Sequence, residues 1–358
     1  MSFDEEPPTA GDREATRLLA RNAELRRERD TATKALGHVT KERDELAERL
    51  AFFQHVADLD PSPPRWTAPK RKPGNHHAIV TAILSDLHLD EVVAPEQVNH
   101  VNAYGREIAV LRVRRWAERV ILLARNYMAG VTFDGAVVMW GGDIVNGELR
   151  TEDLVTNAAP ILDTCLFWAE ILAAALTMIA DEFGKVHVPG VAGNHGRQSA
   201  KPVMKGRVKE NFDWLLFGMV ARILADDSRT TFEFPESNKV LVPIYDTRYW
   251  LEHGDDGGGG GEGWMGVLGP VMRMAAKRLA TNDAVGLGFD HFVCGHWHTL
   301  TWLPRGIVNG SMVGLSQYPW LKAMGFEIPQ QAMWLTTPER GLTLRVNVDL
   351  LDRRREGW

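Results

Sequence analysis

The sequence predicts an α/β domain, built on a mixed sheet or on two packed sheets, that follows an N-terminal helix with a coiled-coil pattern. Three observations support this fold class. Short apolar runs alternate with helix-length segments in the middle of the chain, a proline-rich stretch precedes them, and the first 57 residues carry a heptad repeat. With 358 residues, 44% of them hydrophobic, the chain can bury one large domain and carry an appendage.

Apolar residues recur every seven positions near the N-terminus, within Arg- and Glu-rich sequence. One series is Leu18, Leu25, Ala32, Val39, Leu46 and Phe53, and Ala15, Leu36 and Leu50 occupy part of the matching a positions. This spacing is typical of a coiled coil. The polar residues Asn22, Arg29 and Arg43 share the a seam, where they weaken pairing but fix register and favour a dimer. We expect a homodimer through residues 1–57; the alternative is one amphipathic helix packed on the main domain.

Residues 58–77 are rich in proline and polar residues, so we expect a linker there and a main domain from 78 to 358. In the main domain we expect helices at 106–128 and 161–183 and strands at 78–84, 135–140 and 185–193. Because strands alternate with helices, these early strands should be buried and parallel. The later segments 230–234, 239–251 and 341–350 lie near turn residues and are expected to add antiparallel strands.

Composition indicates in which cellular compartment the protein is expected. Cys165 and Cys294 lie far apart in apolar segments, which indicates reduced core residues and a cytoplasmic protein. The acidic N-terminus has no apolar core, and the apolar stretch 166–180 carries Glu170 and is short for a bilayer span, so secretion and membrane insertion are disfavoured. The net charge of -6 argues against coating nucleic acid by bulk charge, although it leaves a local groove open.

Five apolar runs are each followed by polar residues of types that can bind metal ions. They are Asp86 and His88 in "SDLHLD", Asp143 in "GGD", Asn194 and His195 in "GNHGR", His253 in "YWLEHGDD", and His296 and His298 in "CGHWH". Ligands in open α/β sheets gather beyond the carboxyl ends of strands, so these clusters can converge. Each match alone is weak, but the ordered set is specific. Nitrogen and oxygen donors without thiolate suit Mn, Fe or Zn.

This ordered set resembles the calcineurin-like metallophosphoesterases over residues 78–349. The resemblance implies two packed mixed sheets flanked by helices in a four-layer sandwich. It also implies two divalent metal ions, for which we expect Mn²⁺, with Fe or Zn as alternatives. One ion would be held by Asp86, His88, Asp143 and His298, and the other by Asp143, Asn194, His253 and His296. Asp143 would bridge the two ions, which act on water and on phosphate oxygens.

Two further residues beside the ligands carry expected roles. His195 resembles the family histidine that stabilises the transition state or protonates the leaving oxygen; the alternative is a residue that orients a ligand. Arg197, two positions later, suits a phosphate contact because a guanidinium matches phosphate oxygens, or it is an ordinary surface arginine.

The motifs depart from those of the protein phosphatases in this superfamily. Those enzymes carry GDxVDRG and GNHE, whereas this chain has Asn146, Gly147 and Gly196 in place of the Asp, Arg and Glu. A serine/threonine protein phosphatase is therefore disfavoured. Phosphoesterases of bacteriophages that are regarded as nucleases are similar to this chain in four segments, "GGDIVNGEL", "GNHGR", "KPVMKGRVKENFDWLL" and "VNGS". A phage-encoded chain would act in the host cytoplasm.

Basic residues follow the "GNH" element and favour nucleic acid as the substrate. They are Arg197, Lys201, Lys205, Arg207 and Lys209, while Trp264, Trp297, Trp302 and Trp320 could stack on bases or lie in the core. The glycine-rich segment 255–263 suits a flap over the site or a plain loop. We expect a two-metal phosphodiesterase acting on nucleic acid. The alternatives are a small-molecule phosphodiesterase or phosphatase and a non-catalytic scaffold with a structural metal site.

Overall fold

The computed structural model describes residues 10–57, 76–149, 151–199, 201–202, 205–257, 268–321 and 326–358. Contacts divide the chain into two units, 1–72 and 73–358. The predicted linker lies outside the described residues, except for its last two positions, which form the start of a strand. Within the glycine-rich segment 255–263, residues 258–263 are also outside them, as is Trp264.

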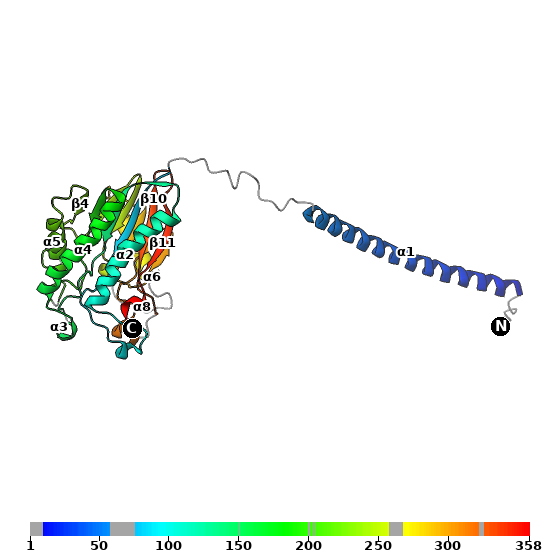
Figure 1. Ribbon diagram of the computed structural model, residues 1–358. Coiled ribbons are helices and arrows are strands. Elements are labelled where there is room, and N and C mark those ends of the chain that lie inside the picture. The colour runs from blue at the N-terminus through cyan, green and yellow to red at the C-terminus, as the bar shows by residue number, and fades with distance from the viewer. Residues whose placement is uncertain are drawn as a thin grey trace. The chain divides into compact units, whose positions relative to one another are not determined.

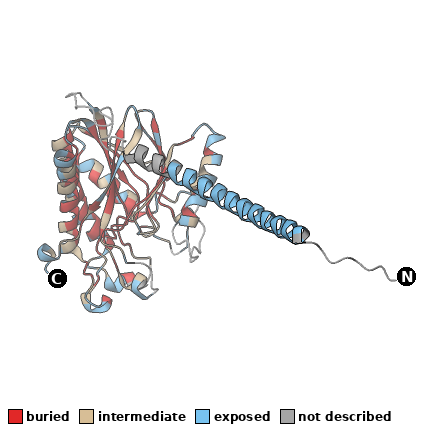
Figure 2. Ribbon diagram, turned by 90° about the vertical axis from the view of Figure 1, so that its right-hand side faces the viewer, coloured by how far each residue is buried: buried red, intermediate tan, exposed pale blue. Residues whose placement is uncertain are grey.

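The first unit contains one long helix, α1 (Ala10–Ala57, 48 residues). Its described side chains from 13 to 47 are all exposed (Figure 2). The helix predicted from the heptad repeat is therefore present, and its described apolar side chains are exposed within the first unit.

The second unit contains two mixed sheets (Figure 1). The first has the order β11-β10-β1-β2-β3-β4, with β1 (His76–Leu84), β2 (Val131–Trp140), β3 (Val186–Pro189), β4 (Thr230–Glu233), β10 (Gln330–Thr337) and β11 (Gly341–Asp349). Strands β1, β2, β3 and β4 run parallel to one another, whereas β10 pairs antiparallel with β1 and β11 pairs antiparallel with β10. The parallel strands point their carboxyl ends to one edge.

The second sheet has the order β5-β6-β7-β9-β8, with β5 (Val240–Ile244), β6 (Thr247–Leu251), β7 (His291–Cys294), β8 (Thr301–Leu303) and β9 (Gly306–Val308). Strands β6, β7 and β9 are parallel, and β5 and β8 pair antiparallel at the two edges. The helices are α2 (Arg106–Tyr127), α3 (Thr151–Thr156), α4 (Ile161–Phe183), α5 (Phe212–Ile223), α6 (Leu268–Asp283), α7 (Gln317–Leu321) and α8 (Arg353–Glu356), with single 3₁₀ turns at Pro95–Val98 and Asp255–Gly257.

Three apolar clusters hold these layers together. Between the sheets, Ile83 and Met139 of the first sheet pack with Val242 and Leu251 of the second. The outer face of the first sheet is covered by α2, α4 and α5, and the outer face of the second by α6 through Val271. The order helix, sheet, sheet, helix is the predicted four-layer sandwich.

Two strand predictions need correction. Residues 230–234 were expected to add an antiparallel strand, but β4 pairs parallel with β3. The reason is α5, a helix that the sequence interpretation did not recognise, because a crossover helix returns the chain to the same edge and makes the next strand parallel. The run 185–193 forms a strand only over Val186–Pro189, and its last residues turn toward the site.

Helix α4 is, by length and composition, the one described helix that could cross a membrane. At 23 residues it is longer than the 166–180 stretch that the sequence singled out. Half of its apolar window is buried in the domain, where Trp168, Leu172 and Ile179 belong to the core beside α2 and α5. This packing accounts for its apolar composition as a core helix.

Candidate metal centre

All seven predicted ligands lie in loops at the carboxyl ends of parallel strands. Asp86 and His88 follow β1, Asp143 follows β2, and Asn194 follows β3; in the other sheet, His253 follows β6, and His296 and His298 follow β7. Because the two sheets face each other, these five loops meet at one edge of the sandwich. Segments that are more than 200 residues apart in the chain thereby share one site.

The ligand loops turn sharply. Five of the seven ligands have left-handed backbone: Asp86 (φ 55°), His88 (φ 43°), Asp143 (φ 51°), His296 (φ 70°) and His298 (φ 54°). Such angles cost non-glycine residues of the order of 1–3 kcal/mol each and are concentrated at functional sites. The fold holds these residues in unfavourable backbone geometry, which aims their side chains into a common space.

Glycines allow the loops to approach each other. A side chain at Gly193 would collide with the backbone and carboxylate of Asp143, and one at Gly295 would collide with the carboxylate of Asp86. Only glycine permits these close approaches. The glycines of "GGD", "GNHG" and "CGHWH" are therefore part of the site's construction.

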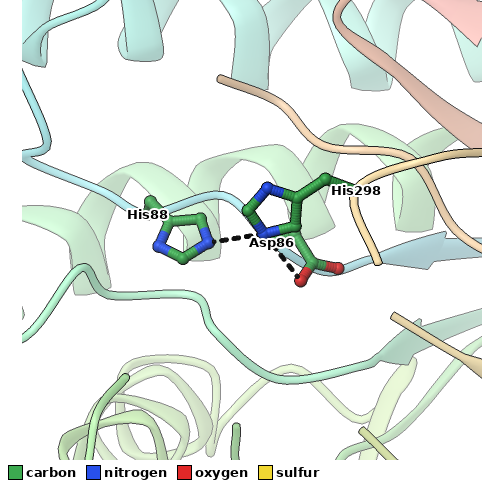
Figure 3. Close-up of side chains that lie close together, drawn as sticks. All are labelled: Asp86, His88 and His298. Atoms are coloured by element: carbon green, nitrogen blue, oxygen red, sulfur yellow. Dashed lines mark hydrogen bonds and ion pairs between the residues drawn. The ribbon is translucent and has the colours of Figure 1, made fainter. Parts of the chain in front are cut away.

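The first group of donors is Asp86, His88 and His298 (Figure 3). Nε2 of His298 lies 3.0 Å from Nε2 of His88 and 3.4 Å from Oδ1 of Asp86. Asp86 is fully buried, and its carboxylate accepts hydrogen bonds from the Ser85 hydroxyl (2.5 Å) and from the His296 backbone N–H (2.8 Å). Three donor atoms thus converge within bonding range of one ion.

The second group is Asp143, His253 and His296, with Asn194 beside it. Nε2 of His253 lies 3.0 Å from Oδ2 of Asp143 and 3.2 Å from Oδ1 of Asn194. The ring of His296 meets that of His253 edge to face, with centroids 5.2 Å apart. A third group, His88, Asp143 and His195, connects the other two. Asp143 belongs to the second and third groups, and His88 links the third group to the first.

Hydrogen bonds on the far ring nitrogens set the tautomers of two ligands. Nδ1 of His253 lies 2.8 Å from the Gly141 carbonyl oxygen, which can only accept, so Nδ1 carries a proton. Nδ1 of His88 lies 3.1 Å from Oδ1 of Asn146 and donates to it. Both rings therefore direct Nε2 toward the neighbouring donors, the arrangement that metal-binding histidines require.

The orientation of the Asn146 amide follows from its own neighbour. Nδ2 of Asn157 donates to the Gly147 carbonyl oxygen (2.7 Å), so Oδ1 of Asn157 faces Asn146 and accepts from its Nδ2 (2.7 Å). In this orientation Oδ1 of Asn146 faces His88 and can accept the hydrogen bond from its Nδ1. The Gly147 carbonyl oxygen thus orients two amides in turn, and through them the ring of His88, a predicted metal ligand.

Replacing Asn146 by Leu is expected to weaken divalent-metal binding about 10- to 100-fold, because His88 loses the acceptor that fixes its tautomer. Calorimetric titration of the metal-free protein measures this. Asn347→Leu is the matched control, since Asn347 also bonds a neighbouring amide, Gln330, but does so on the exposed face of β11. Equal metal affinities for the Asn146→Leu protein and the wild type would show that Asn146 does not orient His88 for metal binding.

Asp213, at the start of α5, clamps two ligand loops together. Its carboxylate accepts from the backbone N–H groups of Ile144, Val145 and Gly193, at 2.9–3.0 Å. Burial and the charge of Asp143 raise the pKa of Asp213 to about 6. The sequence interpretation missed this residue. The available signal was "NFD", in which Asn211 caps α5 by accepting from the Asp213 backbone N–H.

A second buried network supports the Asp86 turn. The Ser311 hydroxyl donates to the Asp86 carbonyl oxygen (3.0 Å), and Nδ2 of Asn309 donates to Ser85 Oγ (2.9 Å) and to Gln331 Oε1 (2.7 Å). Asn309 and Ser311 are both buried. The "VNGS" segment therefore holds the backbone of Asp86 and the side chain of Ser85 in place through buried hydrogen bonds.

The pKa values of the buried groups in the donor cluster shift in opposite directions. Burial favours the neutral form of Asp143, but His253 and His195 outweigh it and hold its pKa well below the ordinary value. Burial and neighbouring imidazoles lower the pKa of His88 to about 3 and that of His296 to about 4. Burial also opposes the charge on His253, yet the Asp143 carboxylate raises its pKa to about 10. An ion at His253 therefore has to displace a proton.

His195 and Arg197 lie beside the ligands. Nδ1 of His195 lies 3.2 Å from the Asn146 carbonyl oxygen, and its backbone N–H donates to Oδ1 of Asp143 (2.7 Å). The guanidinium of Arg197 donates to the carbonyl oxygens of Asn194 (3.2 Å) and Ser199 (3.1 Å). His195 therefore points into the donor cluster, while Arg197 braces the loop that carries Asn194.

The donor set fits divalent ions of the manganese, iron and zinc type. Carboxylate, amide and imidazole donors are present, two rings have their tautomers set for Nε2 coordination, and the free thiols Cys165 and Cys294 are buried outside the donor groups.

Similarity to known proteins is low in sequence. No family model and no curated protein matches the chain. The structure is similar to a predicted phosphoesterase from Streptococcus pneumoniae (12% identity, 75% of this chain and 97% of that one, TM-score 0.28). It is also similar to Vacuolar Protein Sorting 29 from Cryptosporidium parvum (12%, 76% and 98%, 0.30) and to a dimetal phosphatase from Danio rerio (12%, 76% and 99%, 0.34). Similarity this low decides nothing about function, which rests on the chain's own residues.

Proposed function

We propose that this chain is a two-metal phosphodiesterase of the calcineurin-like metallophosphoesterase superfamily and that it hydrolyses nucleic acid. One observation carries the proposal. Donors from five loops form three overlapping groups, linked through His88 and Asp143, and the imidazole of His195, which is not a proposed ligand, lies among them. A structural metal site would need neither a second group of donors nor this histidine.

In this proposal Asp86, His88, Asp143 and His298 hold one ion, and Asp143, Asn194, His253 and His296 hold the other. When bound, such ions supply Lewis acidity, which lowers the pKa of water and neutralises charge on phosphate oxygens. Mn²⁺ is the proposed metal, and Asp213, Asn146 and Ser311 keep the ligand loops in place.

His195 is the proposed catalytic acid. Because the Asn146 carbonyl oxygen accepts from Nδ1, the proton available for transfer is on Nε2, which faces the donors. A protonated ring can stabilise developing charge on phosphate oxygens or protonate the leaving oxygen. The partner is a carbonyl, in place of the carboxylate found in the protein phosphatases. Arg197 remains a proposed phosphate contact at the rim.

The charges around the site support nucleic acid in part. Lys201 and Lys205 are exposed next to the "GNH" loop. Arg207, in contrast, pairs with Asp255 and Asp256, and Lys209 pairs with Glu236. Since these pairs neutralise part of the basic cluster, a small-molecule phosphodiesterase acting on cyclic nucleotides is the second candidate.

The test is turnover of defined substrates by the Mn²⁺-loaded full-length protein. We expect cleavage of labelled DNA or RNA oligonucleotides. The log–log slope of affinity against salt should become shallower by about 0.7 in Lys201→Ala and again in Lys205→Ala, because each variant neutralises one phosphate fewer. Turnover of cyclic nucleotides with oligonucleotides left intact would replace the proposal by the second candidate. Absence of both activities in a protein that binds two ions would refute both.

A further inference from the structure

Helix α1 carries an apolar stripe that is exposed within the first unit. Leu18, Leu25, Val39 and Leu46, at d positions, are 59%, 46%, 60% and 59% exposed, and Leu36, at an a position, is 67% exposed. A long helix with such a stripe buries it against a partner. The charges along the seam indicate which partner fits and in which direction.

A parallel pair of α1 helices would bring like charges together. In a parallel dimer each a residue faces its own copy, so Arg29 would meet Arg29 and Arg43 would meet Arg43 of the partner subunit. Position g faces position e of the next heptad, which places Arg21 against Arg26 of the partner subunit. In a parallel dimer, arginine side chains would therefore repel each other both at the a positions and at the flanking g and e positions.

An antiparallel pair removes these conflicts. Position a then faces position d of the other helix, and when the pair is centred between residues 30 and 31, Arg29 faces Ala32 of the partner subunit and Arg43 faces Leu18 of the partner subunit. An arginine stem can lie along an apolar neighbour while its guanidinium reaches water.

The flanking charges select this register. Position g now faces position g, and Arg21 lies beside Glu42 of the partner subunit, once on each side of the twofold axis. A shift of one heptad in one direction would put Glu28 beside the partner's Glu42, and a shift in the other would put Glu28 beside the partner's Glu28. Only the centred register among these three has attractive g pairs.

We infer that α1 binds the α1 of a second copy of this chain as an antiparallel coiled coil in this register.

Disulfide trapping in the full-length chain tests direction and register together. Leu25 and Leu36 of opposite helices face each other in the inferred dimer. A disulfide-linked dimer is therefore expected when the Leu25→Cys and Leu36→Cys proteins are mixed and oxidised, and not when either is oxidised alone. Cys165 and Cys294 are buried and do not interfere. Cross-linking of each variant with itself, no cross-link in the mixture, or a monomeric wild type by light scattering would each overturn the inference.

Charge exchange supplies an independent readout. Arg21→Glu is expected to weaken the dimer about tenfold, because two attractive pairs become repulsive, and adding Glu42→Arg is expected to restore the affinity. Arg17→Glu, on the outer face of α1, is the matched control and should leave the dimer unchanged. Failure of the double variant to recover would contradict the register.

Discussion

Replacement of Asp143 by Asn is expected to lower hydrolysis of bis-p-nitrophenyl phosphate by about three orders of magnitude and to remove most bound Mn²⁺. Asp143 is the donor common to both proposed ion positions, so the neutral amide weakens both at once. Losing the charge stabilisation of the ions costs several kcal/mol at the transition state, and about 4 kcal/mol corresponds to a factor of 10³. Metal content per chain and initial rates measure the two effects.

Asp134→Asn is the matched control for this substitution. Asp134 lies on the same strand, β2, but its carboxylate bonds His77 and the Tyr245 hydroxyl outside the donor groups. Its replacement should leave both rate and metal content close to those of the wild type. An Asp143→Asn protein that keeps two ions and turns over within tenfold of the wild type would show that Asp143 does not connect the sites.

Replacement of Glu356 by Gln is expected to lower the free energy of unfolding by about 3–5 kcal/mol, because it removes the anionic partner of the buried Arg112 and one of the two anionic partners of Arg115, which also pairs with Asp352. The Glu356 carboxylate, fully buried, accepts from Arg112 (2.9 Å) and Arg115 (3.0 Å). Arg112 also donates to the carbonyl oxygens of Met312 and Val313, next to the Ser311 that supports Asp86. The short helix α8 is thus connected through α2 to the loop that contains Ser311, Met312 and Val313.

The effect of Glu356→Gln should depend on pH. Burial opposes ionisation of Glu356, but the bond from Arg112 outweighs it and holds the pKa below the ordinary 4.5. A lowered folded-state pKa contributes stability above 4.5 that is lost as the pH falls. Urea unfolding should therefore show a full difference at pH 7 and a shrinking one below about pH 4.5.

Glu118→Gln is the control for this measurement. Glu118 pairs with Arg114 one helical turn away on the exposed face of α2, and such pairs contribute a few tenths of a kcal/mol. A Glu356→Gln effect no larger than that of Glu118→Gln would show that the buried arginines do not depend on this carboxylate.

The sequence predicted the fold class and the convergence of the candidate donors, but it left one interior strand of the first sheet unrecognised. Each ligand follows an apolar run, and the short motifs around them are local, so their order along the chain could be interpreted directly. Strand β10 could not be recognised in this way, although "QQAMWLTT" pairs with β1 in the centre of the first sheet. Its position depends on contacts made across the whole domain, and no local pattern encodes them.

The residues that support the ligands were missed for a similar reason. Asp213, Asn157 and Gln331 act through hydrogen bonds to backbone or amide groups that are distant in sequence, and an isolated Asp, Asn or Gln carries no sign of such a partner. Asn309 and Ser311 are both buried, where Ser311 bonds the Asp86 carbonyl oxygen and Asn309 bonds the neighbouring Ser85. Only the folded chain distinguishes a residue that faces the substrate from one that holds a ligand in place.

The most direct test of a two-ion centre is anomalous diffraction from crystals grown with Mn²⁺. The proposal predicts two peaks about 3.5–4 Å apart, one beside Asp86, His88 and His298 and the other beside Asn194, His253 and His296, with Asp143 between them. A single peak, or two peaks that do not share Asp143, would contradict it.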